Sequence, residues 1–124
     1  MKFTRILLGA FLVLGVVGAV AVRPAAAQEM CPEGMLPTIA SLHHCVEHAY
    51  AQGYIDNAGV AQSLLPKLNA AQAALDRGQP AVAARLLQAF INQVQARAGV
   101  HIQADHAAHM ADHAQMVIDA LSAQ

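Results

Sequence analysis

Hydrophobic residues recur at intervals of three and four along most of the chain after residue 36, the spacing that gathers them on one face of an α-helix. Glycine and proline interrupt this pattern, and the segments between them predict helices over residues 37–52, 57–77, 80–98 and 103–122. Polar and apolar residues do not alternate as they would in a strand, and alanine is abundant. Four helices joined by short turns predict an all-α protein, a small antiparallel four-helix bundle.

Several glycines and prolines suggest where these helices start, stop or bend. Pro37 and Pro80 suit the first position of a helix, where the missing N–H has no partner in any case. Gly53 suits the left-handed residue that ends one. Pro66 lies inside the second expected helix and cannot donate to the carbonyl of Gln62, so we expect a kink or a break there.

The first 27 residues have the organisation of a signal peptide. Lys2 and Arg5 form a basic start, residues 6–22 are apolar, and small alanines lead to a cleavage site before Gln28. The competing interpretation is an uncleaved membrane anchor, since the apolar run is close to the length of about 20 residues that spans a bilayer. We expect a mature protein of residues 28–124 that is secreted or periplasmic and has no membrane contact after cleavage.

Removing that segment makes the chain acidic. Residues 28–124 hold four basic and eight acidic side chains, a net charge of −4 with neutral histidines. This balance argues against nucleic acid as a partner, because phosphate binding requires clustered lysine or arginine. All seven histidines belong to this part of the chain, so their full protonation would bring the charge to +3.

The two cysteines, Cys31 and Cys45, are expected to form a disulfide in an exported protein. The bond would fasten an irregular arm, residues 28–36, to the first helix of a domain covering residues 37–124. Closing so short a loop stabilises by about 3 kcal/mol in the chain-entropy account. A metal site with Cys, Cys and His ligands is the alternative, which export makes less favoured.

The last predicted helix carries three histidines along one edge. His106, His109 and His113 follow one another at spacings of three and four, with Asp105 and Asp112 on the solvent side of that edge. Imidazoles one turn apart can chelate a transition metal, and nearby carboxylates can bind it or orient the rings. The candidate metals are zinc, copper and nickel. The alternatives are ordinary boundary residues paired with aspartates, or a group that responds to pH.

A second candidate half-site lies on the first helix, where His44 and His48 are four residues apart. Histidines from the first and last helices could converge on one ion, as they do in the cores of other bundles. The helical wheel, however, points His44 and His48 toward solvent, away from the apolar stripe. Whether the two sets converge is left open by the sequence.

Catalytic motifs are missing from the sequence. It has no HExxH zinc motif, no CxxCH haem attachment, no Gly-x-Ser-x-Gly elbow and neither phosphate-binding glycine pattern. We therefore expect a protein that is not an enzyme.

The central part of the sequence resembles the FIMAH domain, a small helical module of secreted bacterial proteins. The matching residues are Gly53-Tyr54-Ile55-Asp56-Asn57-Ala58-Gly59, Ser63-Leu64-Leu65, Lys67-Leu68, Ala70-Ala71, Gly78 and Phe90-Ile91-Asn92-Gln93-Val94, followed more weakly by Gly99, Ile102, Ala114-Gln115 and Ile118. The resemblance implies an extracytoplasmic helical accessory module with no catalytic residues to transfer. The histidines of the last helix depart from the pattern, which would have acidic or apolar residues there.

These observations predict an exported, non-enzymatic helical module that acts by contact with another protein or with the cell envelope. The alternative is a small histidine-rich protein that binds or buffers a transition metal. The sequence identifies neither the partner nor the oligomeric state.

Overall fold

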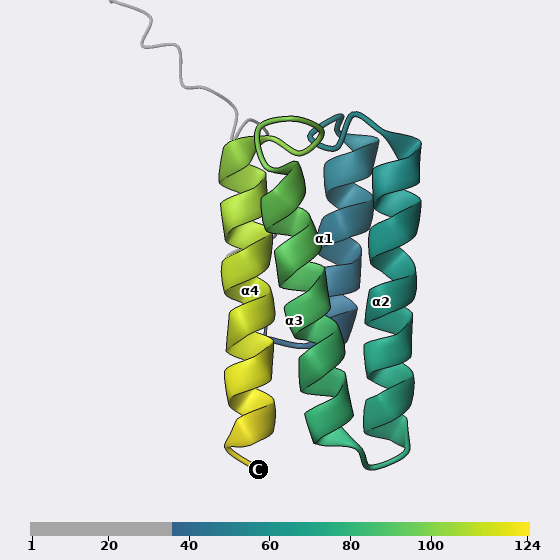
Figure 1. Ribbon diagram of the computed structural model, residues 1–124, viewed down its shortest axis with the longest axis vertical. Helices are drawn as coiled ribbons and strands as arrows, with labels where there is room; N and C mark the ends of the chain where they lie inside the picture. Colours follow the sequence, from purple (N-terminus) through teal and green to yellow (C-terminus); the bar gives the residue numbers. More distant parts are fainter. Residues whose placement is uncertain (1–35) are drawn as a thin grey trace, which may run out of the picture.

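The computed structural model describes residues 36–124, which form four α-helices (Figure 1). The helices are α1 (Ile39–Ala51), α2 (Ala58–Asp76), α3 (Pro80–Arg97) and α4 (Ala104–Ser122). The described part of the chain contains no β-strand, so the all-α prediction is confirmed there. The predicted signal peptide and nearly all of the predicted arm lie outside the described residues.

Each helix packs against the helices that precede and follow it along the chain, and α4 also returns to α1. The chain turns at alternating ends of the bundle (Figure 1). The α1–α2 connector, residues 52–57, and the α3–α4 connector, residues 98–103, lie at the same end. An isolated bridge between Ile55 and Ile102 joins them, and we call this region the paired-loop end.

Helix α1 starts later than proline placement predicts. The expectation that Pro37 is the first helical residue is wrong, because Thr38 is the N-cap and Ile39 begins the helix. The Thr38 hydroxyl accepts from the Ser41 N–H at 3.1 Å, and the Ser41 hydroxyl accepts from the Thr38 N–H at 3.2 Å. This reciprocal capping box outweighs the preference of proline for the first turn.

Helices α1 and α2 end just before a glycine, as expected. Gly53 and Gly78 come directly after the cap residues of these two helices and have φ values of 81° and 71°, a region that other residues adopt at a cost. The prediction of a break at Pro66 is wrong, since α2 continues through this residue without interruption. Pro66 and Gln62 both lie on the exposed side, where water can serve the carbonyl that loses its donor.

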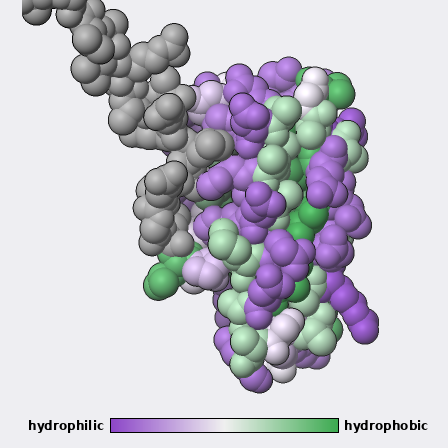
Figure 2. Space-filling view, turned by 90° about the vertical axis from the view of Figure 1, so that its left-hand side faces the viewer, coloured by the Kyte–Doolittle hydropathy of each residue, from purple (hydrophilic) through white to green (hydrophobic). Residues whose placement is uncertain are grey.

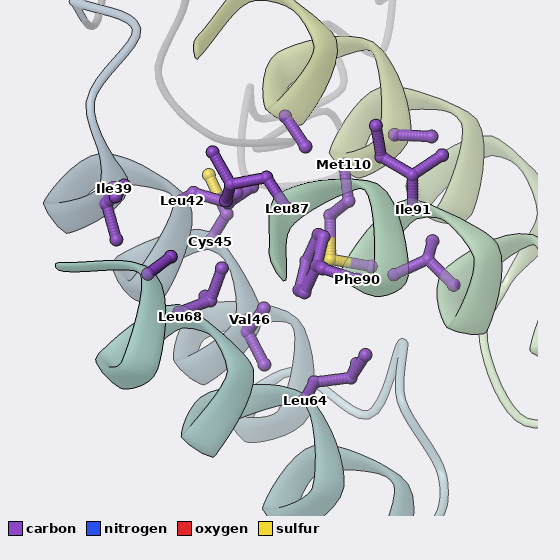
Figure 3. Packing of buried hydrophobic residues seen from close by; sticks show 14 of the residues in the cluster. Ile39, Leu42, Cys45, Val46, Leu64, Leu68, Leu87, Phe90, Ile91 and Met110 are labelled. Atoms are coloured by element: carbon purple, nitrogen blue, oxygen red, sulfur yellow. The ribbon is translucent and has the colours of Figure 1, made fainter. Parts of the chain in front are cut away.

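The core lies between the helices and receives large side chains from all of them. Figure 3 shows Leu42, Leu64, Phe90 and Met110, one from each helix, directed into this space, and all four are buried. The connectors contribute Ile55 and Ile102, both about 1% exposed. Burial of the helices' apolar faces is the main source of their stability, because isolated helices of this length are marginal in water.

Hydrophilic and hydrophobic residues are intermixed along the face of the bundle on the α4 side (Figure 2). Within residues 36–124, no helix has the length and apolar character needed to cross a membrane. Cys45 on α1 is buried, with 1% of its surface exposed. Its expected partner, Cys31, lies outside the described residues, so the disulfide stays a prediction.

Candidate functional site

The contact between α1 and α4 differs from the rest of the core because it is lined by histidines. The residues are Ser41 and His48 from α1 and His106, His109 and His113 from α4, and we call this group the histidine seam. His113, three residues after Met110 and four before Val117, lies on the same helix face as these core side chains. Its ring is therefore buried, with 4% exposure, deeper than the edge position that the sequence indicates.

A buried hydrogen bond connects the two helices at His113. Its Nε2 lies 2.7 Å from the Ser41 hydroxyl oxygen. The hydroxyl also lies 2.9 Å from the Leu36 carbonyl and 2.8 Å from the Thr38 carbonyl, so several partners compete for its single proton. Ser41 thus has two roles: it caps the start of α1 and satisfies a buried imidazole of α4.

At the other end of the seam, His106 is stacked on Tyr54 from the α1–α2 connector. Their ring centroids are 3.7 Å apart, and the planes are inclined by 19°. Both ring nitrogens of His106 are buried without a hydrogen-bond partner in the described structure. A charged ring over a phenol gains about 0.5–1 kcal/mol at exposed sites. A buried donor without an acceptor costs about 1–3 kcal/mol, so this environment favours neutral His106.

The two histidines of the first helix have different surroundings. His44 is exposed, as the helical wheel indicates, with its ring centroid 6.1 Å from that of His48. The outward position expected for His48 is wrong, because this side chain is half-buried and close enough to affect the titration of His106. Histidines from α1 and α4 therefore do approach each other, a point on which the sequence is silent.

His109 completes the seam between His106 and His113. Its Nε2 is buried and has no hydrogen-bond partner among the described residues, and its ring meets that of His113 edge-on with centroids 6.4 Å apart. Burial and His109 lower the pKa of His106 from its ordinary value of 6.5, Asp105 partly opposes this, and His48 adds a smaller lowering. Burial, and then His109, lower the pKa of His113 as well.

The candidate metal ligands do not form a three-residue cluster within the described part of the chain. Within residues 36–124, no three His, Cys, Asp or Glu side chains gather closely enough to hold an ion. Asp105 and Asp112, the expected supporting carboxylates, are exposed. His113 is engaged by Ser41, and His106 is stacked on Tyr54. The histidines thus come together as a packed seam of imidazoles.

A second polar region lies at the paired-loop end. The backbone N–H of Asp56 donates to the His101 carbonyl at 3.0 Å, and that of Gln103 donates to the Tyr54 carbonyl at 2.9 Å. The side chains of Asp56 and His101 also meet, with Oδ1 and Nδ1 2.9 Å apart. These bonds brace two connectors that are separated by more than forty residues in the sequence.

Beside the braced connectors is a shallow polar depression of about 330 Å³. It is lined by Asn57, Gly59, Val60, Ser63, Gln93, Arg97 and His101. The Gln93 amide donates to the Ser63 hydroxyl, which in turn donates to the Val60 carbonyl at 2.7 Å. Asn57 accepts the Val60 N–H at 3.1 Å and so caps α2. The hydrogen bonds fix the polar walls in place.

Sequence reasoning missed several of these residues. A signal for Ser41 exists, because Thr38 three residues earlier forms the start of a capping pattern and would place both at a helix end. For Tyr54 and His101 no comparable signal exists, because their roles depend on two connectors meeting at one end of the bundle. Helical spacing places Arg97 next to Gln93, but only the fold brings both beside Asn57 and Ser63 of the second helix and its connector.

Comparison with known families matches residues 39–119 to the FIMAH domain, which is most of the chain and all four helices except the last three residues of α4. No curated protein and no solved structure gives a significant match. The match confirms the resemblance carried by the glycine-rich connector and the Phe90–Val94 segment, and it extends through the histidine-bearing part of α4. This chain belongs to the FIMAH domain family.

Proposed function

We propose that this protein is an exported, non-enzymatic binding module, an antiparallel bundle that presents its paired-loop end to another protein or to a component of the cell envelope. The single observation that carries the proposal is the bracing of the two connectors by the Ile55–Ile102 bridge and the surrounding backbone hydrogen bonds. Loops held by a rigid scaffold are the usual place for binding residues. A surface formed before contact also loses little conformational entropy when a partner docks.

The composition of this end also supports contact with a partner. Val100, at the tip of the α3–α4 connector, is 67% exposed and borders a second depression with Tyr54 and His101. The neighbouring polar depression presents Arg97, Gln93 and Asn57. An exposed apolar residue beside fixed hydrogen-bonding groups is the combination found at protein interfaces, where apolar contacts contribute affinity and polar groups contribute orientation.

The family match provides a further argument. Many of the residues that carry the FIMAH pattern meet at this end, from Gly53 to Gly59 in one connector and at Gly99 and Ile102 in the other. Several of them have structural roles, since Ile55 and Ile102 are buried and Asn57 caps α2. The pattern therefore specifies the shape of the surface, and the exposed Val100 and Arg97 give this chain its particular chemistry.

Site-specific photo-crosslinking in the producing cells tests this proposal. A photoreactive residue replaces Val100, and in a matched control it replaces Val82, which is also exposed (39%) but lies in the first turn of α3 at the opposite end of the bundle. We expect a discrete crosslinked product with the Val100 probe and none with the Val82 probe. Arg97→Ala in the Val100-probe protein should weaken that product.

Equal crosslinking at both positions, or none at Val100, would contradict a contact surface at the paired-loop end. Protease treatment of the product separates the two kinds of partner, because a crosslinked protein is degraded to peptides whereas an envelope polysaccharide or lipid is not. Either identity is compatible with a binding module. Only the location of the crosslink decides the proposal.

A further inference from the structure

Histidines of α1 and α4 come near one another in a place where residues 36–124 supply few groups that could neutralise their charge. His106, His109 and His113 follow one edge of the first half of α4, and the half-buried His48 of α1 lies near enough to His106 to contribute to the lowering of its pKa. We propose that the histidine seam is an acid-sensitive latch: at neutral pH it joins α4 to α1, and protonation in acidic surroundings loosens that contact. This device is separate from the proposed binding surface and does not depend on it.

Among the described residues, the groups around the seam offer little compensation for positive charge. From α1 the seam receives His48, itself basic, and the uncharged hydroxyl of Ser41. The α1–α2 connector contributes the phenol ring of Tyr54. On α4 itself, the carboxylates of Asp105 and Asp112 are both exposed, and Asp105 opposes the lowering of the His106 pKa.

The remaining helix that packs against α4 adds no acidic group. Helix α3 carries Arg85 and Arg97 as its charged residues, both exposed. His44, stacked against His48 from the solvent side, adds another basic group on α1. Protonation therefore places like charges close together on the two sides of one helix contact, and their repulsion acts directly on that contact.

The buried nitrogens explain why the neutral seam is the stable one. Both nitrogens of His106 and Nε2 of His109 lie buried with no acceptor among the described residues, so each added proton would be a buried donor without a partner. The Ser41–His113 hydrogen bond can survive protonation, because Nε2 is able to donate to the hydroxyl oxygen. Protonation of His113 still costs free energy because it places a positive charge on a ring that is buried away from water.

The direction of the pH effect follows from linkage. The pKa values of His106 and His113 are lowered in the folded protein, so the unfolded chain binds more protons wherever the two states differ. The stability contributed by these groups is fully present above their ordinary pKa of 6.5 and is lost as the pH falls through the lowered folded values. The latch thus begins to open in mildly acidic conditions.

Urea unfolding of the purified protein at about pH 7.5 and about pH 5.5 tests the proposal, because this interval contains the titration of imidazole. We expect the midpoint urea concentration to fall on acidification. The double variant His106→Asn/His113→Asn should lose most of this pH dependence. The matched control His43→Asn/His44→Asn, which changes two α1 histidines that are not part of the seam, one paired with Glu47 and the other exposed, should keep it.

An unchanged midpoint in the wild-type protein, or equal flattening by the control variant, would overturn the proposal. A second measurement does not depend on the variants folding. NMR titration of the imidazole signals of the unmodified protein should give midpoints below pH 6.5 for His106 and His113. Midpoints at or above that value would show that the seam accepts protons without cost, and the latch would be excluded.

Discussion

The contact between α2 and α3 and the contact between α1 and α4 are built from different side chains. Every buried residue of α2 and α3 is apolar, from Leu64 and Leu68 on one helix to Leu87 and Phe90 on the other. Within the described residues, the two buried polar side chains are Ser41 on α1 and His113 on α4. The α2–α3 contact thus buries apolar side chains and has a partly buried hydrogen bond from Gln93 to Ser63, whereas the α1–α4 contact also buries the Ser41–His113 pair, whose hydrogen bond involves a titratable ring.

This difference underlies our proposal that one helix contact of the bundle responds to pH while the other does not. The free energy gained by apolar burial does not change with pH in the range where imidazole titrates. The stability that the α2–α3 contact contributes should therefore be the same at neutral and at mildly acidic pH. In the proposed latch, the part of the α1–α4 stability that comes from neutral His106 and His113 is lost when these rings are protonated. The histidines of the last helix lie in the contact for which we propose this acid response.

The largest expected effect comes from the apolar pair. Phe90→Ala should lower the free energy of unfolding by about 3–5 kcal/mol, because it removes a fully buried ring and leaves a cavity at the centre of the bundle. Urea unfolding measures this loss. We expect a similar loss at neutral and at mildly acidic pH, and a loss that varied strongly with pH would remove the distinction between the two contacts.

The next effect should come from the hydrogen bond of the histidine seam. Ser41→Ala deprives the buried His113 ring of its partner and removes half of the capping box, which together should cost about 1–3 kcal/mol. Thr38→Ala removes the cap alone, at about 1 kcal/mol, and is the matched control. Thermal unfolding of both variants measures the difference. A Ser41→Ala protein as stable as the Thr38→Ala protein would show that the buried bond contributes nothing.

A smaller effect should follow from the stacked pair at the other end of the seam. Tyr54→Leu keeps an apolar side chain next to His106 but removes the ring-on-ring contact, worth about 0.5–1.5 kcal/mol. The loss should appear in urea unfolding together with a downfield change in the His106 ring proton signals, since ring-current shielding disappears. An unchanged His106 spectrum would contradict the stacked geometry.

The smallest effect is expected from metal ions. A site of micromolar affinity would raise the free energy of unfolding by about 2.7 kcal/mol at a hundredfold excess of zinc over its dissociation constant. Because no three ligands gather within the described residues, we expect no shift in the melting temperature with zinc, copper or nickel. A clear rise in melting temperature with one of these ions, absent from the His109→Ala variant, would contradict this prediction and show that the seam binds metal.

Sequence reasoning predicted the four helices because their apolar residues repeat at helical spacing and their ends carry glycine and proline. The two wrong predictions concerned prolines, and in each case a neighbouring group outweighed the usual effect of proline. Pro37 is not the first helical residue, because the capping box of Thr38 and Ser41 sets the start of α1 at Ile39. Pro66 does not break α2, because the carbonyl of Gln62, which loses its donor, lies on the exposed side of the helix. Neither outcome can be read from the proline alone, since each depends on which side of the helix faces the core.

The candidate site was predicted only in part, for a physical reason. The spacing of His106, His109 and His113 places them on one edge of a helix, and they do lie together in the structure. The other half of the site depends on the register between α1 and α4, which pairs Ser41 with His113 and brings His48 toward His106. Register between two helices is decided by the packing of the whole core, which periodicity within one helix does not contain.

Residue-resolved hydrogen exchange at neutral and mildly acidic pH is the measurement that tests the central claim most directly, with each amide's rate divided by its intrinsic rate at that pH. We predict that acidification lowers the protection of α1 and the first half of α4 while α2 and α3 keep theirs. A uniform loss across the four helices, or no loss at all, would contradict a bundle in which one helix contact responds to protons and the other does not.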